Sequence, residues 1–230
     1  MPDDQSLRLR LVRRGLIGLL ILAALLFISA GSLRYWQGWA FMVLNLAFSL
    51  SLVIYFYKRD PELLERRLLR KEKASEQKLI MTLGRLASVP AYLLPGLDYR
   101  FGWSRTLVEP VPLWLTLLAL LVILDCHLLF FWVMSVNRFA ASIIQVEAGQ
   151  TVAATGPYRL VRHPMYLGIV VSQFATPLAL GSFIALPAFV LLTPIIVLRL
   201  LSEEKILCRE LPGYSEYCQH TRRRLIPFVW

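Results

Sequence analysis

Long apolar runs alternate with short basic segments along almost the whole chain. A helix that crosses a bilayer takes about 20 mostly apolar residues. Four runs come close to that length, at 15–31, 36–57, 79–97 and 113–136. A fifth run, 165–201, is too long for one crossing and contains the turn signals Thr176-Pro177 and Gly181-Ser182. The pattern predicts an all-α, polytopic membrane bundle of about five to six transmembrane helices that ends in a helical hairpin.

Three segments have a second interpretation. The run 79–97 is interrupted by Arg85, Pro90 and Pro95, so it either crosses the bilayer or lies partly in its interface. The run 15–31 follows four arginines and resembles a signal peptide, but the next apolar run starts at once, which favours a retained hairpin. The connector 58–78 mixes leucines with charges after a helix start at Asp60-Pro61, and we expect an amphipathic or solvated helix.

Composition supports the membrane interpretation. Hydrophobic residues make up 57% of the 230 residues, mean hydropathy is +0.58, and only 17% are charged, whereas a soluble domain has about a quarter charged residues. The net charge of +10 would suit nucleic acid. However, the basic residues gather in the short segments between apolar runs, as they do in membrane proteins that orient themselves and meet anionic lipid headgroups. We therefore expect membrane lipids, and not nucleic acid, as partners.

The same basic segments predict an orientation. Six crossings would place both termini on one side, and the positive-inside rule makes that side cytoplasmic. This corresponds to the inner membrane of a bacterium or the endoplasmic reticulum of a eukaryote. The three cysteines, Cys126, Cys208 and Cys218, form no CxxC pair and indicate neither a disulfide framework nor a zinc site. We expect no metal.

A first polar motif, Arg162-His163-Pro164, precedes the fifth apolar run. Proline is favoured at the first helical position and pushes the preceding residue away from helical torsions. His163 should therefore stand at a helix entrance, where backbone N–H groups and the positive end of the helix dipole suit an anion. The plainer alternative is that Arg162 and His163 are juxtamembrane charges and that Tyr166 is an interfacial aromatic residue.

A second polar motif, Arg199-x3-Glu203-Glu204, ends the same run. Arg199 and Glu203 are four residues apart and should share a helix face. Carboxylates at the C-terminal end of a helix oppose its dipole, so a positive partner is expected. It is either the sulfonium or ammonium group of a cofactor or the nearby arginines Arg209 and Arg222 to Arg224.

Two ionisable residues inside the fourth run, Asp125 and His127, are also candidates, since ionisable groups in a membrane are often functional. They are two apart and point to different faces of a helix, which favours structural hydrogen bonding. The dinucleotide, phosphate-loop, serine-hydrolase and metalloprotease motifs are absent from the sequence, which excludes a soluble Rossmann-type enzyme.

Taken together, three blocks in the last third resemble the isoprenylcysteine carboxyl methyltransferase and phospholipid methyltransferase superfamily of integral membrane enzymes. They are Gly156-x-Tyr158, Arg162-His163-Pro164-x-Tyr166-x-Gly168 and Glu203-Glu204-x-x-Leu207. The resemblance covers roughly 137–230, which would form a methyltransferase core, while 1–136 would supply N-terminal helices and a connector to one integrated domain. It implies S-adenosylmethionine in a cytosolic pocket and a lipophilic or lipidated acceptor that arrives from the bilayer.

The resemblance also implies residue roles. Arg199 would face the methyl-accepting carboxylate, while His163 and Tyr158 would be candidate bases for a thiol or amine acceptor. Gln150 stands where the family's eukaryotic enzymes carry a histidine. The cofactor would be lined by Gln145, Gln150, Thr151, Val152, Ala153, Tyr158, His163, Pro164, Met165, Tyr166 and Glu203.

Three alternatives remain open. A phospholipid or small-thiol methyltransferase would share the cofactor site and differ in its acceptor. A sterol reductase that uses NADPH has a related motif, but there an aspartate follows the glycine, whereas here Gly168 precedes Ile169. A membrane scaffold without activity would leave His163, Arg199 and Glu203 with structural contacts only.

Overall fold

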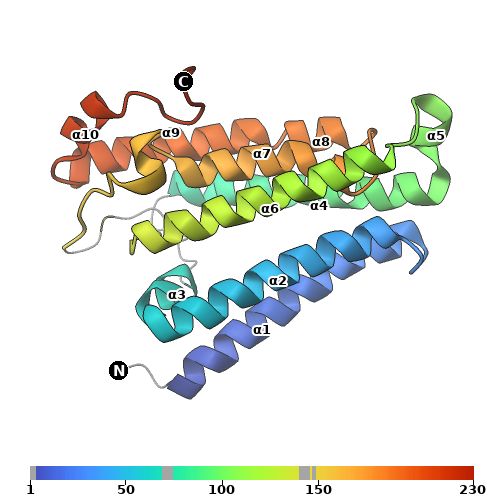
Figure 1. The fold of residues 1–230 in the computed structure, drawn as a ribbon, viewed down its shortest axis with the longest axis horizontal. Helices are drawn as coiled ribbons and strands as arrows, with labels where there is room; N and C mark the ends of the chain where they lie inside the picture. The colour runs from blue at the N-terminus through green and yellow to red at the C-terminus, as the bar shows by residue number, and fades with distance from the viewer. Residues whose placement is uncertain (1–3, 69–74, 140–145, 147–148) are drawn as a thin grey trace.

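The computed structural model describes residues 4–68, 75–139, 146 and 149–230. Within these residues the chain is helical and has no strand, which confirms the predicted all-α class (Figure 1). The elements are α1 (Asp4–Ala23), the π-helical η1 (Ala24–Ile28), α2 (Trp36–Arg59), α3 (Pro61–Leu68), α4 (Ser75–Phe101), α5 (Trp103–Leu107), α6 (Leu113–Val136), the short 3-10 helix η2 (Gly156–Arg159), α7 (Pro164–Ala179), α8 (Leu186–Val190), α9 (Thr193–Glu210) and α10 (Tyr214–His220).

Five stretches of the described chain are long and apolar enough to cross a membrane, which confirms a polytopic bundle. They are Ser6–Ile28, Trp36–Arg59, Gln77–Phe101, Leu113–Val136 and Leu186–Glu210. The shorter α7, of 16 residues, lies alongside α6 and runs back along the bundle (Figure 1). It forms the predicted hairpin with α8 and α9. Both termini lie toward the same end of the helices, with α3 and α10.

The hairpin turns at one of the two predicted signals. Gly181 adopts φ +74° and Ser182 follows it, so the chain reverses between α7 and α8. The signal at Thr176-Pro177 is wrong as a break, because α7 continues through Pro177 to Ala179. Pro177 has no backbone N–H to donate, but it lies in the last turn of α7, where only one helical hydrogen bond is lost. The neighbouring Thr176 Oγ1 donates to the Ser172 carbonyl at 2.7 Å.

The prolines of the third run do not interrupt its helix. Pro90 and Pro95 lie inside α4, which continues over 27 residues. Neighbouring helices can accommodate such prolines within a membrane bundle. The helix α4 packs closely against η1 at Gly96. An added Cβ there would lie 1.9 Å from Ser29 Oγ and 2.7 Å from the Leu26 carbonyl oxygen. Only glycine lets α4 approach η1 this closely.

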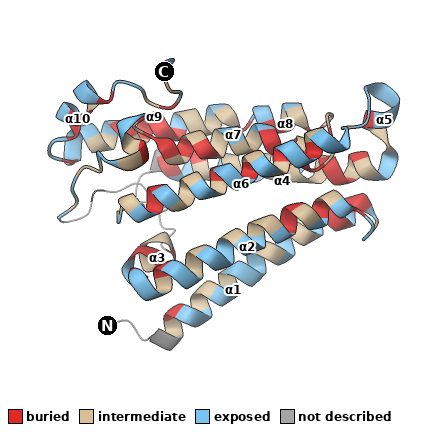
Figure 2. Cartoon of the chain, in the orientation of Figure 1, coloured by how far each residue is buried: buried red, intermediate tan, exposed pale blue. Residues whose placement is uncertain are grey.

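The end of the bundle opposite the termini is fixed by a buried carboxylate. Asp98, 4% exposed, accepts hydrogen bonds from the Ser104 N–H at 2.7 Å, from Ser104 Oγ at 2.5 Å and from Ser182 Oγ at 2.5 Å. Three donors converge on one carboxylate, which joins α4 and α5 to the hairpin turn. Large apolar side chains remain exposed along α1, α2 and α6, as expected for helices that face lipid (Figure 2).

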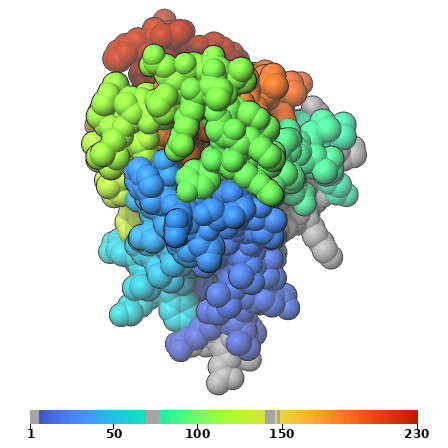
Figure 3. Space-filling model, turned by 90° about the vertical axis from the view of Figure 1, so that its right-hand side faces the viewer, coloured from blue at the N-terminus to red at the C-terminus, as the bar shows by residue number. Residues whose placement is uncertain are grey.

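The connector after α2 contains an amphipathic helix, as predicted. α3 begins at Pro61, and Asp60 Oδ1 accepts a hydrogen bond from the Leu63 N–H at 3.2 Å. Leu63 and Leu64 are buried against Phe56 and Met134, so the apolar face of α3 packs on the bundle. Viewed end-on, the N-terminal hairpin forms one side of the molecule and the C-terminal residues form the opposite side (Figure 3).

The two ionisable residues of α6 lie away from the site described below. The His127 ring stacks on Phe48, with ring centroids 4.1 Å apart and planes within 2° of parallel. Asp125 is exposed on the helix surface. Neither residue lines the cavity formed by the predicted motifs.

Candidate active site

The predicted motifs converge on one cavity at the end of the bundle that carries α10. Its wall combines the segment after α6, the segment 150–153, η2, the first turn of α7, the last turns of α9, and α10. The lining residues are Asn137, Phe139, Gln150, Thr151, Val152, Ala153, Tyr158, Arg162, His163, Pro164, Met165, Tyr166, Arg199, Glu203, Leu207, Leu211, Tyr214 and Tyr217. Every residue predicted to contact the cofactor is among them except Gln145, which lies outside the described residues.

The helix entrance at His163 has the predicted form. His163 precedes α7 with φ −125° and ψ 63°, and Pro164 is the first helical residue. The backbone N–H groups of Arg162 and His163 donate to the carbonyls of Arg223 and Arg224, both at 2.9 Å. The C-terminal segment is thereby paired with the segment that leads into α7, and this fixes the position of the α7 entrance.

The His163 side chain lies next to an acid, Glu204, that was not among the predicted site residues. Glu204, 6% exposed, lies 3.4 Å from His163 Nε2, 3.0 Å from Arg162 Nη1 and 2.7 Å from Arg224 Nε. Arg224 was one of the arginines expected as a positive partner. A carboxylate surrounded by three basic side chains is neutralised within the protein, so Glu204 does not need a charged ligand.

Glu203 has a different environment, although it is the adjacent residue. Its Oε2 accepts a hydrogen bond from the Tyr166 hydroxyl at 2.6 Å, and that hydroxyl accepts one from Arg199 Nε at 3.1 Å. Arg199, Glu203 and Tyr166 therefore form one polar group on the cavity wall. This arrangement confirms that Arg199 and Glu203 share a helix face. Among the residues that the structure describes, no cation forms an ion pair with Glu203.

Tyr158 faces the same cavity from η2. Its hydroxyl accepts a hydrogen bond from Asn137 Nδ2 at 2.9 Å, and its carbonyl accepts one from the Tyr217 hydroxyl at 2.7 Å. Burial raises the pKa of the Tyr158 hydroxyl well above its usual value of 10.0, and the hydrogen bond from Asn137 offsets this only in part. The hydroxyl therefore stays protonated at neutral pH.

Another guanidinium, that of Arg67, lies near Tyr158 and Tyr166. Arg67 of α3 packs over the Phe130 ring, 4.9 Å from its centroid, and interacts electrostatically with Tyr158 and Tyr166. Burial lowers the pKa of Arg67 to about 10, and the two tyrosines oppose that shift. Arg67 therefore stays charged at neutral pH. The interaction of Arg67 with these tyrosines was not predicted, because α3 is distant in sequence from the motifs.

Other lining residues were also missed as site residues. Tyr214 and Tyr217 are three apart on α10 and share a face, a spacing that could have predicted a common role. The Tyr214 hydroxyl is buried and, among the described residues, has no hydrogen-bond partner. Asn137 directly follows α6, and nothing in the local sequence indicates that it reaches Tyr158.

A second cavity, of about 300 Å³, opens between α4, α7 and the α8–α9 arm. Its wall is mostly apolar and includes Gly84, Tyr92, Ile169, Phe189, Ile195 and Ile196, together with polar side chains that include Arg85, Gln173 and Arg199. Arg199 is 8% exposed and also lines the first cavity. One buried guanidinium therefore faces both the polar cavity and an apolar cavity among the membrane helices.

The fold and the site together define a helical membrane protein with a polar cavity at one end of its bundle and an apolar cavity that meets it at one arginine. Residues 117–209 match the model of the isoprenylcysteine carboxyl methyltransferase (ICMT) family. The match confirms the resemblance and supports a membrane methyltransferase of the isoprenylcysteine type. It begins within α6, earlier than the motifs indicated, and ends at the end of α9.

Proposed function

We propose that the protein uses S-adenosylmethionine to methylate the carboxylate of a lipophilic, isoprenylcysteine-like acceptor. The observation that carries this proposal is the position of Arg199 at the junction of the two cavities. A guanidinium can bind a carboxylate through two parallel hydrogen bonds. An acceptor with its apolar chain in the second cavity would thus present its carboxylate to the first one.

The polar cavity has groups that suit this cofactor. Glu203 supplies a carboxylate without a cationic partner among the described residues, and Tyr214 supplies a buried hydroxyl without a hydrogen-bond partner there. Buried polar groups are normally hydrogen-bonded, so a ligand with positive and hydroxyl groups would complete both. We propose that Glu203, Tyr214 and the segment 150–153 hold the cofactor.

When bound, the cofactor supplies a methyl group on a positively charged sulfur. Arg199 would hold the acceptor carboxylate, the group that would receive the methyl and become an ester. Tyr166 fixes Arg199 relative to Glu203 through its hydroxyl. Such a displacement depends on alignment and on exclusion of water, and a carboxylate acceptor needs no base.

The orientation belongs to the same proposal. A soluble cofactor requires the polar cavity to face the cytosol, and the described basic segments 58–68 and 199–230 lie at that end of the chain's helices. We therefore propose cytoplasmic termini. Labelling of single cysteines introduced at position 2 and in the loop 108–112 with a membrane-impermeant thiol reagent would test this orientation.

The decisive experiment is calorimetric binding of S-adenosylhomocysteine to the purified protein in detergent, with Glu203→Ala as the paired variant. Micromolar binding that is lost in the variant supports the cofactor assignment. An S-farnesylcysteine derivative and phosphatidylethanolamine are then compared as acceptors, and methylation of only the second would overturn the acceptor assignment. A well-folded wild-type protein that binds no S-adenosylhomocysteine would overturn the proposal, and NADPH would be tested next.

A further inference from the structure

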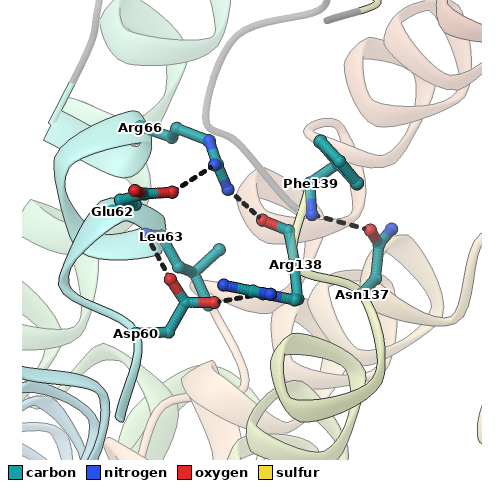
Figure 4. Close-up of polar contacts among 7 residues, drawn as sticks. All are labelled: Asp60, Glu62, Leu63, Arg66, Asn137, Arg138 and Phe139. Atoms are coloured by element: carbon teal, nitrogen blue, oxygen red, sulfur yellow. Dashed lines mark hydrogen bonds and ion pairs between the residues drawn. The ribbon is translucent and has the colours of Figure 1, made fainter. Parts of the chain in front are cut away.

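The joint between α2 and α3 is linked to the cavity wall through a single aspartate. The Asp60 N–H donates to the Phe56 carbonyl at 2.7 Å, at the end of α2, while its Oδ1 caps α3. Its second carboxylate oxygen accepts a hydrogen bond from Arg138 Nε at 2.8 Å (Figure 4). The Asp60 side chain is 8% exposed and that of Arg138 is 68% exposed. A buried acid thus holds an arginine from the segment that follows α6.

Arg66 of α3 makes a second link to the same segment. Its Nη1 donates to the Arg138 carbonyl at 2.8 Å, and its Nη2 pairs with Glu62 at 3.1 Å (Figure 4). The Arg66 guanidinium also lies over the Phe139 ring, 5.3 Å from its centroid. Two side chains from α3 and its cap therefore contact two consecutive residues after α6.

The turn 137–139 belongs to the cavity wall through the two residues that flank Arg138. Asn137 and Phe139 both line the cavity. Asn137 Oδ1 accepts a hydrogen bond from the Phe139 N–H at 2.9 Å, which closes a tight turn, while Asn137 Nδ2 donates to the Tyr158 hydroxyl. Contacts therefore run without a gap from Asp60 and Arg66, through Arg138 and Asn137, to Tyr158.

We infer that Asp60 and Arg66 are positioning residues for the cofactor cavity, and that α3 holds the turn 137–139 in its binding geometry before a ligand arrives. The inference rests on the proposed function. Fixing the backbone of a residue costs conformational entropy. A wall segment ordered in advance by α3 removes that cost from cofactor binding. The N-terminal half thereby contributes to the site, although none of its described residues lines the polar cavity.

The test is the affinity of S-adenosylhomocysteine for Arg66→Met and for Asp60→Asn, measured by calorimetry. The asparagine keeps an oxygen to cap α3 and loses the charge that pairs with Arg138. We expect each Kd to rise about five- to tenfold, the size of one lost ordinary hydrogen bond, because the lost contact acts on the cavity through the turn and not on the ligand itself. The KM of the acceptor should stay unchanged, because the apolar cavity does not include this turn. Arg66→Lys should recover part of the affinity.

Glu65→Gln is the matched control. Glu65 is on the same helix and pairs with Arg10 of α1 at 3.1 Å, away from the turn 137–139. We expect its Kd to stay within about twofold of wild type. If Arg66→Met lowers the melting temperature but leaves the Kd unchanged, the contacts of Arg66 with the turn 137–139 only stabilise the fold, and the inference is overturned. Absent binding in the wild type would overturn the proposed function as well.

Discussion

Glu203 and Glu204 are adjacent in the chain, yet their carboxylates have separate partners. The Glu203 carboxylate is hydrogen-bonded to the Tyr166 hydroxyl at 2.6 Å, whereas Glu204 is within 3.4 Å of Arg162, His163 and Arg224. Successive residues on a helix project about 100° apart, so one acid lines the cavity while the other ties α9 to the C-terminal segment. The pair therefore combines a candidate ligand contact with a structural ion cluster.

This difference predicts that one of two adjacent substitutions lowers the affinity for the cofactor and the other lowers the stability of the fold. Glu203→Ala should weaken S-adenosylhomocysteine binding by roughly ten- to hundredfold, as expected for a lost charged contact, with little change in stability. Glu204→Ala leaves three basic side chains without their acid and should destabilise the fold by about 3–5 kcal/mol. Calorimetry and thermal unfolding of both variants check this. Equal effects of the two substitutions on affinity and on stability would contradict the assignment.

A second prediction concerns the pH dependence of turnover. Burial raises the pKa of the Tyr158 hydroxyl above 10.0, so Tyr158 remains protonated below that pH and cannot act as a base. With a carboxylate acceptor that needs no base, kcat/KM should be constant between about pH 7.5 and pH 9.5. A rise through this range would indicate an acceptor that loses a proton, such as a thiol. Tyr158→Phe should leave the shape of the profile unchanged.

Much of the fold follows from local sequence. The limits of α6, Leu113–Val136, coincide with the predicted run 113–136 because Pro112 directly precedes the run and the polar Asn137 directly follows it. The entrance of α7 at Pro164 and the turn at Gly181 are set by the torsions of single residues. The prolines of α4 were misleading, since tertiary packing decides whether a proline ends a membrane helix.

The site was predictable where its residues are close in sequence. Arg199 and Glu203 share a helix face, and the four-residue spacing is enough to show it. The contact of Asn137 with Tyr158 joins separate segments, so no local pattern reports it. The contact of Arg224 with Glu204 was one of the two alternatives predicted for the acid motif. The stretch that contains Gln145 lies outside the described residues, and its predicted cofactor contact stays a prediction.

The apolar cavity gives a third prediction. An added Cβ on Gly84 would lie 3.4 Å from Ile195 Cγ2, an ordinary contact, so Gly84→Ala should have little effect. The longer side chain of Gly84→Leu would fill the space proposed for the acceptor. We expect the acceptor KM to rise about tenfold or more, with an unchanged Kd for S-adenosylhomocysteine. A Kd that rises in parallel with KM would show that the two cavities do not have separate ligands.

The carboxylate of Asp98 gives the last prediction, because it lies at the opposite end of the bundle from the polar cavity. In Asp98→Asn one oxygen becomes an NH₂ donor that must face the donors from Ser104 and Ser182. A buried donor left without an acceptor should lower stability by about 1.5–3 kcal/mol and reduce the melting temperature. Because the hairpin turn is remote from the polar cavity, the folded fraction should bind S-adenosylhomocysteine with the wild-type Kd. Ser104→Ala removes one of the hydroxyl donors and should be milder. A weakened Kd at an unchanged melting temperature would instead show that the hairpin turn is coupled to the site through α7 and α9.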